Sequence, residues 1–73
     1  MKIFKKLKVG QVWVQKEPFR EMVFEILDIK GGQVKCSHKY IKSEEHPDLE
    51  GFESIRIESK FDFKWDKKLI QDN

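Results

Sequence analysis

A chain of 73 residues is long enough for one small domain, and its equal shares of hydrophobic and charged residues, 38% each, place it between ordinary globular proteins and disordered ones. No apolar run is long enough to span a bilayer, and no apolar stretch follows the basic opening, so we expect neither a membrane segment nor a signal peptide. The single cysteine, Cys36, excludes an intramolecular disulfide and favours a reducing compartment, for which we expect the cytoplasm.

The net charge of +2 hides an uneven distribution of charged residues along the chain. Residues 1–20 carry six basic residues and one Glu, whereas residues 43–59 carry six acidic residues and one Arg. These two poles can neutralise each other in the fold or form separate faces for separate partners. Mutual neutralisation is the simpler expectation.

An alternating pattern that begins after Gly10 predicts the first strand. Val12 and Val14 recur at period two, so we expect them to face the core and Trp13 to lie on the wetter face or at an edge. Pro18 has no backbone donor and interrupts the pattern. Residues 16–20 are therefore predicted to form a connecting loop.

Two further strands flank the pair Gly31 and Gly32, which suits a tight hairpin turn. Apolar residues alternate from Met22 to Ile26 and then shift phase by one residue at Leu27, which indicates a β-bulge. A bulge of this kind bends a strand so that a small sheet can curl into a barrel. The third strand is predicted to place four side chains on one face: Val34, Cys36, His38 and Tyr40.

The second half of the chain is predicted to hold an acidic loop at about residues 43–53 and two more strands. Ile55 and Ile57 alternate with charged residues and indicate a fourth strand. Aromatic residues recur at period two from Phe61 to Trp65, which we interpret as a fifth strand, although a single 3₁₀ turn that begins near Ser59 would also bring some of them to the core. Leu69 and Ile70, in the short tail that follows, could close one end of the core.

Five short strands, a bulge and a long acidic loop predict an all-β domain that spans residues 1–73. We expect a small, strongly bent five-stranded antiparallel SH3-like barrel, with an OB-like barrel as the alternative. The expected core consists of Val12, Val14, Phe24, Ile26, Ile29, Val34, Cys36, Ile55, Ile57, Phe61 and Phe63.

Four segments of the chain together resemble a known family. They read VGQVW at residues 9–13, FEILDI at 24–29, GQVK at 32–35 and FKWDKKLI at 63–70. In these segments the chain is similar to small, mostly uncharacterised SH3-like proteins of bacteriophages and prophages, and it departs from their pattern in the acidic insertion around residues 44–50. The resemblance implies an accessory role in an infected or lysogenic cell and carries over no catalytic residues.

The residues that could perform chemistry are few. Cys36, His38 and His46 are the only thiol and imidazole side chains, too few for a structural zinc site and without the third group that would orient a nucleophile. The carboxylates of residues 44–50 lack the spacing of a calcium loop. We therefore expect no enzymatic activity, no cofactor and no metal.

These observations favour a non-catalytic interaction module, expected to be a monomer that binds another protein. Aromatic side chains usually carry the energy of such contacts, and neighbouring cations add to it. The candidate binding residues are Trp13, Lys16, Phe19, Arg20, Tyr40 and Trp65. The alternative is binding of nucleic acid, in which Lys5, Lys6 and Lys8 of the basic opening would contact phosphates.

Overall fold

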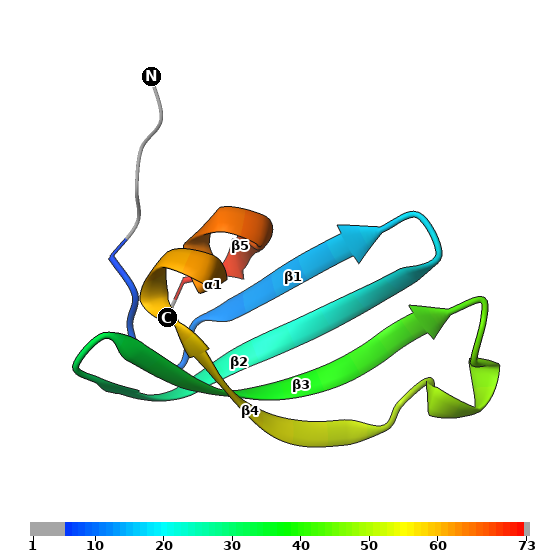
Figure 1. Cartoon of the computed structure of the whole chain (residues 1–73), viewed down its shortest axis with the longest axis horizontal. Coiled ribbons are helices and arrows are strands. Elements are labelled where there is room, and N and C mark those ends of the chain that lie inside the picture. Colours follow the sequence, from blue (N-terminus) through cyan, green and yellow to red (C-terminus); the bar gives the residue numbers. More distant parts are fainter. Residues whose placement is uncertain (1–5, 73) are drawn as a thin grey trace.

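The computed structural model describes residues 6–72 as a single antiparallel sheet with a short helix packed at one end (Figure 1). The strands lie in the order β4-β3-β2-β1-β5. The elements in chain order are β1 (Val12–Glu17), β2 (Arg20–Lys30), β3 (Gln33–Ser43), the 3₁₀ turn η1 (Pro47–Leu49), β4 (Glu53–Ser59), α1 (Lys60–Asp66) and β5 (Lys68–Gln71).

This strand order confirms the predicted small all-β, five-stranded SH3-like barrel. Strands β1 to β4 form a meander in which each strand pairs with the next, and β5 returns to pair with β1. An OB barrel uses a Greek-key order instead. The alternative fold is therefore not the one adopted.

Both predicted features of the β2–β3 hairpin are present. Gly31 has a φ of +59°, a conformation that a residue with a Cβ rarely adopts, and it opens the two-residue turn. The register then shifts between Ile26, which lies opposite Cys36, and Asp28, which lies opposite Lys35. Leu27 is thus the extra residue of the predicted β-bulge.

The β1–β2 connection is shorter than the loop predicted for residues 16–20. Lys16 still pairs with Glu21, and Glu17 with Arg20, so only Pro18 and Phe19 form the turn. Pro18 needs no backbone donor at this position, because it lies outside the ladder of hydrogen bonds. The two strands consequently stay paired up to the two-residue turn.

The fifth strand predicted over Phe61 to Trp65 is wrong, because these residues form the helix α1. The hydroxyl of Ser59 accepts a hydrogen bond from the backbone N–H of Asp62 at 3.1 Å and caps the helix. In a helix, a spacing of two residues turns side chains to nearly opposite sides. Phe63 accordingly enters the core, whereas Phe61 and Trp65 point to solvent.

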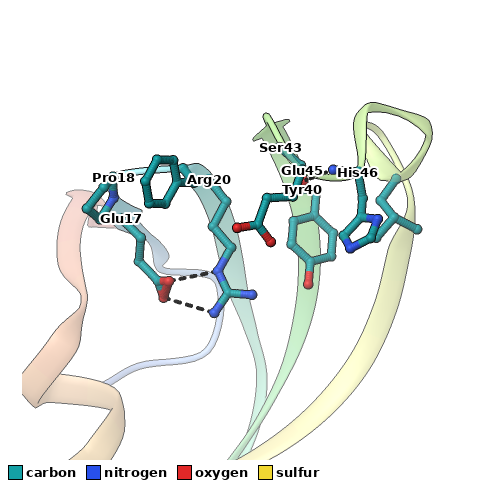
Figure 2. Close-up of a pocket in the computed structure, with 9 residues that line it drawn as sticks. Glu17, Pro18, Arg20, Tyr40, Ser43, Glu45 and His46 are labelled. Atoms are coloured by element: carbon teal, nitrogen blue, oxygen red, sulfur yellow. Dashed lines mark hydrogen bonds and ion pairs between the residues drawn. The ribbon is translucent and has the colours of Figure 1, made fainter.

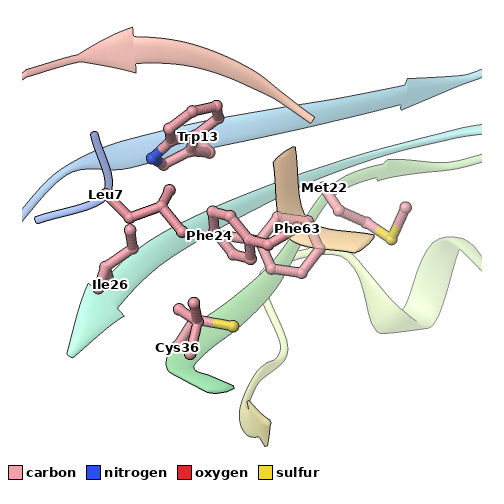
Figure 3. Close-up of a cluster of buried hydrophobic side chains, with 8 residues drawn as sticks. Leu7, Trp13, Met22, Phe24, Ile26, Cys36 and Phe63 are labelled. Atoms are coloured by element: carbon pink, nitrogen blue, oxygen red, sulfur yellow. The ribbon is translucent and has the colours of Figure 1, made fainter. Parts of the chain in front are cut away.

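The core lies between the inner face of the sheet and α1 (Figure 3). Six of the expected core residues are buried, and Val12 and Ile29 are half-buried. Ile55 and Ile57 are exposed, against expectation, since the inner face of β4 carries Ser54 opposite His38 and Arg56 opposite Cys36. The buried hydrophobic residues are Leu7, Trp13, Val14, Met22, Phe24, Ile26, Val34, Cys36 and Phe63.

Trp13 is the most important correction to the predicted core. It pairs with Phe24 on the inner face, and its ring meets that of Phe63 edge-on at a centroid distance of 5.5 Å. Its indole N–H donates to Oε1 of Gln11 at 3.2 Å, so the polar atom of this buried ring is satisfied. The alternation of β1 thus turns the tryptophan inward, which the apolar pattern alone did not show.

A buried cation stands at the centre of the fold. The side chain of Lys67 is only 1% exposed, and its ammonium donates to Glu58 at 2.7 Å and to Asp66 at 2.9 Å. The same ammonium lies 4.5 Å from the ring centroid of Phe24 and 4.8 Å from that of Phe63. Both carboxylates and both rings compensate the loss of water around the charge.

Replacing Lys67 with Met should lower the free energy of unfolding by about 2 to 3 kcal/mol, because the carboxylate of Glu58 then loses its cation in a poorly hydrated place. Urea denaturation measures the change. Lys68→Met, which removes an exposed cation from the next residue, is the control and should change stability by less than about 0.5 kcal/mol. Adding Glu58→Gln to the Lys67 variant should recover part of the loss, and equal stability of wild type and Lys67→Met would contradict this role.

Candidate functional site

The six candidate binding residues are not gathered in one place. Trp13 is buried in the core and is therefore unavailable as a surface anchor. Phe19, Arg20 and Tyr40 line one pocket, and Lys16 and Trp65 line a second hollow. The structure thus unites three of the six residues and assigns two others to a separate surface.

The first site, which we call the turn pocket, has a volume of about 300 Å³. It lies between the β1–β2 turn and the loop that follows β3 (Figure 2). Its walls are formed by Glu17, Pro18, Phe19, Arg20, Tyr40, Ser43, Glu45, His46 and Leu49.

Backbone hydrogen bonds fix the two walls of the turn pocket relative to each other. The backbone N–H of Glu44 donates to the carbonyl oxygen of Phe19 at 2.9 Å and so ties the loop to the turn. Within the loop, Ser43 accepts a hydrogen bond from the N–H of His46 and donates its own N–H to Glu50. The pocket is therefore formed before any ligand binds, which lowers the entropy cost of binding.

An ion pair orients the only guanidinium in the turn pocket. Arg20 donates two hydrogen bonds to the Glu17 carboxylate, at 2.7 and 3.2 Å. Hydrogen bonding to Arg20 lowers the pKa of Glu17, and hydrogen bonding to Glu17 raises the pKa of Arg20, so both groups stay charged at neutral pH. Both side chains are partly exposed, so the pair positions Arg20 more than it stabilises the fold.

Glu45 supplies the remaining charge of the turn pocket. Its carboxylate projects into the space between the side chains of Arg20 and Tyr40 (Figure 2). Since Arg20 is already paired with Glu17, the walls carry one carboxylate in excess. An apolar side chain could rest on Phe19, Tyr40 and Leu49 while a neighbouring cation meets Glu45.

The turn pocket is lined by residues from both the basic and the acidic segment of the chain. Arg20 belongs to the first segment and Glu45 to the second, and both line the pocket. Between the described parts of residues 1–20 and residues 43–59, no ion pair forms; Lys8 pairs instead with Asp72, and Arg20 with Glu17. The expected mutual neutralisation is therefore not achieved by direct ion pairs there.

The outer face of α1 forms a second surface, which the sequence did not indicate. Phe61 and Trp65, 72% and 74% exposed, lie one helical turn apart with their rings stacked at 5.9 Å. Next to them is an open hollow of about 560 Å³ that Trp65 shares with Lys16, Lys68 and Ile70. A four-residue spacing of aromatics is the signal that would have revealed this face if a helix had been expected.

The basic opening of the chain lies only partly within the described residues. Lys5 falls outside them. Lys6 and Lys8 are exposed, and Lys8 lies 3.8 Å from the carboxylate of Asp72. Neither lysine lines the turn pocket or the hollow beside Trp65.

The thiol and imidazole groups lie in unlike environments. Cys36 is fully buried, and burial raises the pKa of its thiol to about 11, so it is protonated at neutral pH and a poor nucleophile. His38 is buried between the rings of Phe24 and Tyr40, whereas His46 lines the turn pocket. Over residues 6–72, no three side chains of the metal-binding types cluster as a metal site would require. None of the helices in this range is long and apolar enough to cross a membrane.

The buried His38 should make the domain sensitive to acid. Burial lowers the pKa of His38 below its ordinary value of 6.5, and its Nε2 has no hydrogen-bond partner among the described residues. The unfolded chain therefore takes up a proton at higher pH than the folded one, and stability should fall as the pH drops below about 6.5. His38 can contribute at most about 1.4 kcal/mol per pH unit to the slope of the unfolding free energy against pH, because it takes up one proton.

Chemical denaturation at intervals between pH 7.5 and pH 5 would measure this effect in a window above the carboxylate titrations. The slope should vanish in His38→Phe and persist in the control His46→Gln, because His46 is exposed. A slope that is unchanged in His38→Phe would show that another group is responsible.

The known proteins offer no further guide to these surfaces. Comparisons of the chain with protein-family models, with curated proteins and with solved structures find no match. The function therefore has to be inferred from the turn pocket and from the exposed face of α1.

Proposed function

We propose that this domain is a non-catalytic protein-binding module that takes up a short segment of a partner in the turn pocket. The observation that carries the proposal is the pocket itself, in which Phe19, Arg20 and Tyr40 come together from two strands and a turn. Aromatic and arginine side chains are the residues that most often dominate binding energy at protein interfaces.

The chemistry of the walls suggests what the segment contains. Pro18, Phe19, Tyr40 and Leu49 provide an apolar surface, and Glu45 adds an exposed carboxylate. A segment with an apolar side chain next to a Lys or Arg satisfies both requirements. We further propose an accessory role in a phage or prophage and a cytoplasmic location, for which the support is the resemblance of the sequence and its single cysteine.

The proposal predicts that Phe19→Ala weakens binding at least about tenfold, because it removes an exposed anchor from the pocket wall. The probe is a set of peptides selected from a random library by the immobilised wild-type domain, with affinity measured by fluorescence polarisation. Phe61→Ala removes an even more exposed Phe from a different surface and is the control.

Glu45→Lys should weaken the binding of those selected peptides that carry a basic residue, since the substitution reverses the excess charge of the pocket. A library that yields no peptide, or peptides that bind Phe19→Ala as tightly as wild type, would contradict the proposal.

Binding of nucleic acid is the second candidate, and the exposed face of α1 favours it. The stacked pair Phe61 and Trp65 offers ring faces on which bases could stack. Lys60 and Lys64 form the neighbouring row of the same helix, one residue before each aromatic, and could contact phosphates. Asp62 and Asp66 follow on the other flank and would repel the same backbone, which is why we place this function second.

Titration of isotope-labelled protein with single-stranded DNA and RNA separates the two candidates. The second candidate predicts amide shifts confined to α1 and its neighbours, lost in Trp65→Ala and strongly reduced at near-physiological salt. Our first proposal predicts no such shifts. It predicts instead that a selected peptide moves the amides of the turn pocket with a weaker dependence on salt, since one charge contact there accompanies mostly apolar ones.

A further inference from the structure

Strand β4 forms one edge of the sheet. It pairs with β3 on one side and has no partner strand on the other within residues 6–72, and its first part lies along the lower rim of the sheet in Figure 1 before the strand rises toward α1. Its register with β3 is continuous over seven residue pairs, without the bulge, the proline or the lysine that commonly protect an edge. On its outer face, Ile55 and Ile57 are 56% and 65% exposed. An edge of this kind favours addition of another strand.

The parity of the ladder shows which backbone groups are available at this edge. The carbonyl of Phe52, just before β4, accepts a hydrogen bond from Tyr40, and the N–H of Lys60, just after it, donates to Gly32. The backbone groups of these two even-numbered residues therefore face β3. Backbone groups alternate between the two sides of an antiparallel strand. The N–H and C=O groups of the odd-numbered residues from 53 to 59 therefore point away from the sheet.

The charged side chains of β4 are complementary to those of a second β4. Arg56 is exposed and has no ion-pair partner among the described residues. Glu58 lies two residues after Arg56 and on the same face of the strand. Its Oε1 accepts from Lys67, and its Oε2 has no hydrogen bond from within residues 6–72. A cation and an acceptor thus lie side by side on an open edge.

We propose that two copies of this chain associate through β4, antiparallel to each other about a two-fold axis at Ile57. The outward backbone groups then form a new ladder, and the two sheets become one continuous sheet. In this register Arg56 lies opposite Glu58 of the second copy, and the reverse pair repeats the contact. On the outer face, Ile57 lies beside its own counterpart.

The neighbouring register and the other edge of the sheet are less suitable for this association. The register centred on Arg56 places the two Arg56 side chains directly opposite each other, and like charges in such positions repel. The opposite edge of the sheet, β5, is only four residues long, and its pairing with β1 is irregular at Val12 and Trp13. A dimer through β4 would replace the monomer expected from the sequence.

Sedimentation equilibrium of the full chain between roughly 10 μM and 1 mM tests the association, because an interface of one short strand pair dissociates in that range. Wild type should pass from monomer to dimer. Arg56→Glu, which places like charges opposite each other twice, and Ile57→Lys should each raise the dissociation constant about tenfold or more. Ile70→Lys, the same change at an exposed Ile on β5, is the control and should leave the dissociation constant unchanged. A wild-type monomer at 1 mM would overturn the proposal.

Cysteine cross-linking tests the register. Ile57→Cys should form an intermolecular disulfide on mild oxidation, because opposed residues of paired strands bring their Cα atoms within reach of a disulfide. Ile55→Cys should not, since Ile55 lies opposite Ser59 of the second copy. The native Cys36 is buried and does not compete. Cross-linking of Ile55→Cys in preference to Ile57→Cys would overturn the proposed register, and circular dichroism of each variant verifies that the fold is kept.

Discussion

The buried ammonium of Lys67 is the interaction on which the arrangement of this domain depends. It connects three elements of the chain, because it binds Glu58 of β4 and Asp66 of α1 and lies over the rings of Phe24 in β2 and Phe63 in α1. A buried charge is stable only when its partners are well placed around it, so this contact fixes how α1 docks on the sheet. That orientation sends Phe63 inward and leaves Phe61 and Trp65 on the surface.

The same polar interior decides which side chains of β4 reach the outside. The inner face of β4 supplies Ser54 near the buried His38 and Glu58 to Lys67, so the inner positions of the strand are occupied by polar groups. Its isoleucines are consequently left on the outer face. A small barrel has few core positions. Here one cation and one imidazole occupy space that a more ordinary core would fill with apolar residues from β4.

Much of the fold could be predicted from the sequence because it depends on local signals. The turn at Gly31 and the bulge at Leu27 each follow from a backbone requirement or a shift of period within a few residues. The prediction of a strand over Phe61 to Trp65 failed because the structure of this segment depends on long-range contacts. Aromatics at period two read as a strand, yet the Ser59 cap and the docking of Phe63 made them a helix.

The candidate site could likewise be predicted only in part from the sequence. Phe19, Arg20 and Tyr40 could be proposed as binding residues from their types, but their meeting in one pocket depends on the hairpin register and on the bond between Glu44 and Phe19. Trp13 has the same residue type as Trp65, and only the packing of the barrel makes one a core residue and the other a surface residue. Lys67 could not be recognised as buried, since lysine is almost always exposed.

Gln11 has a consequence for how this domain could be joined to other proteins. Its buried amide binds the carbonyl of Lys6, the N–H of Lys8 and the carboxylate of Asp72, so both ends of the described chain are held at one point. That point lies at the start of β1, whereas the turn pocket lies beyond its end, on the opposite side of Figure 1. A tether or a fused domain attached there would leave the pocket unobstructed.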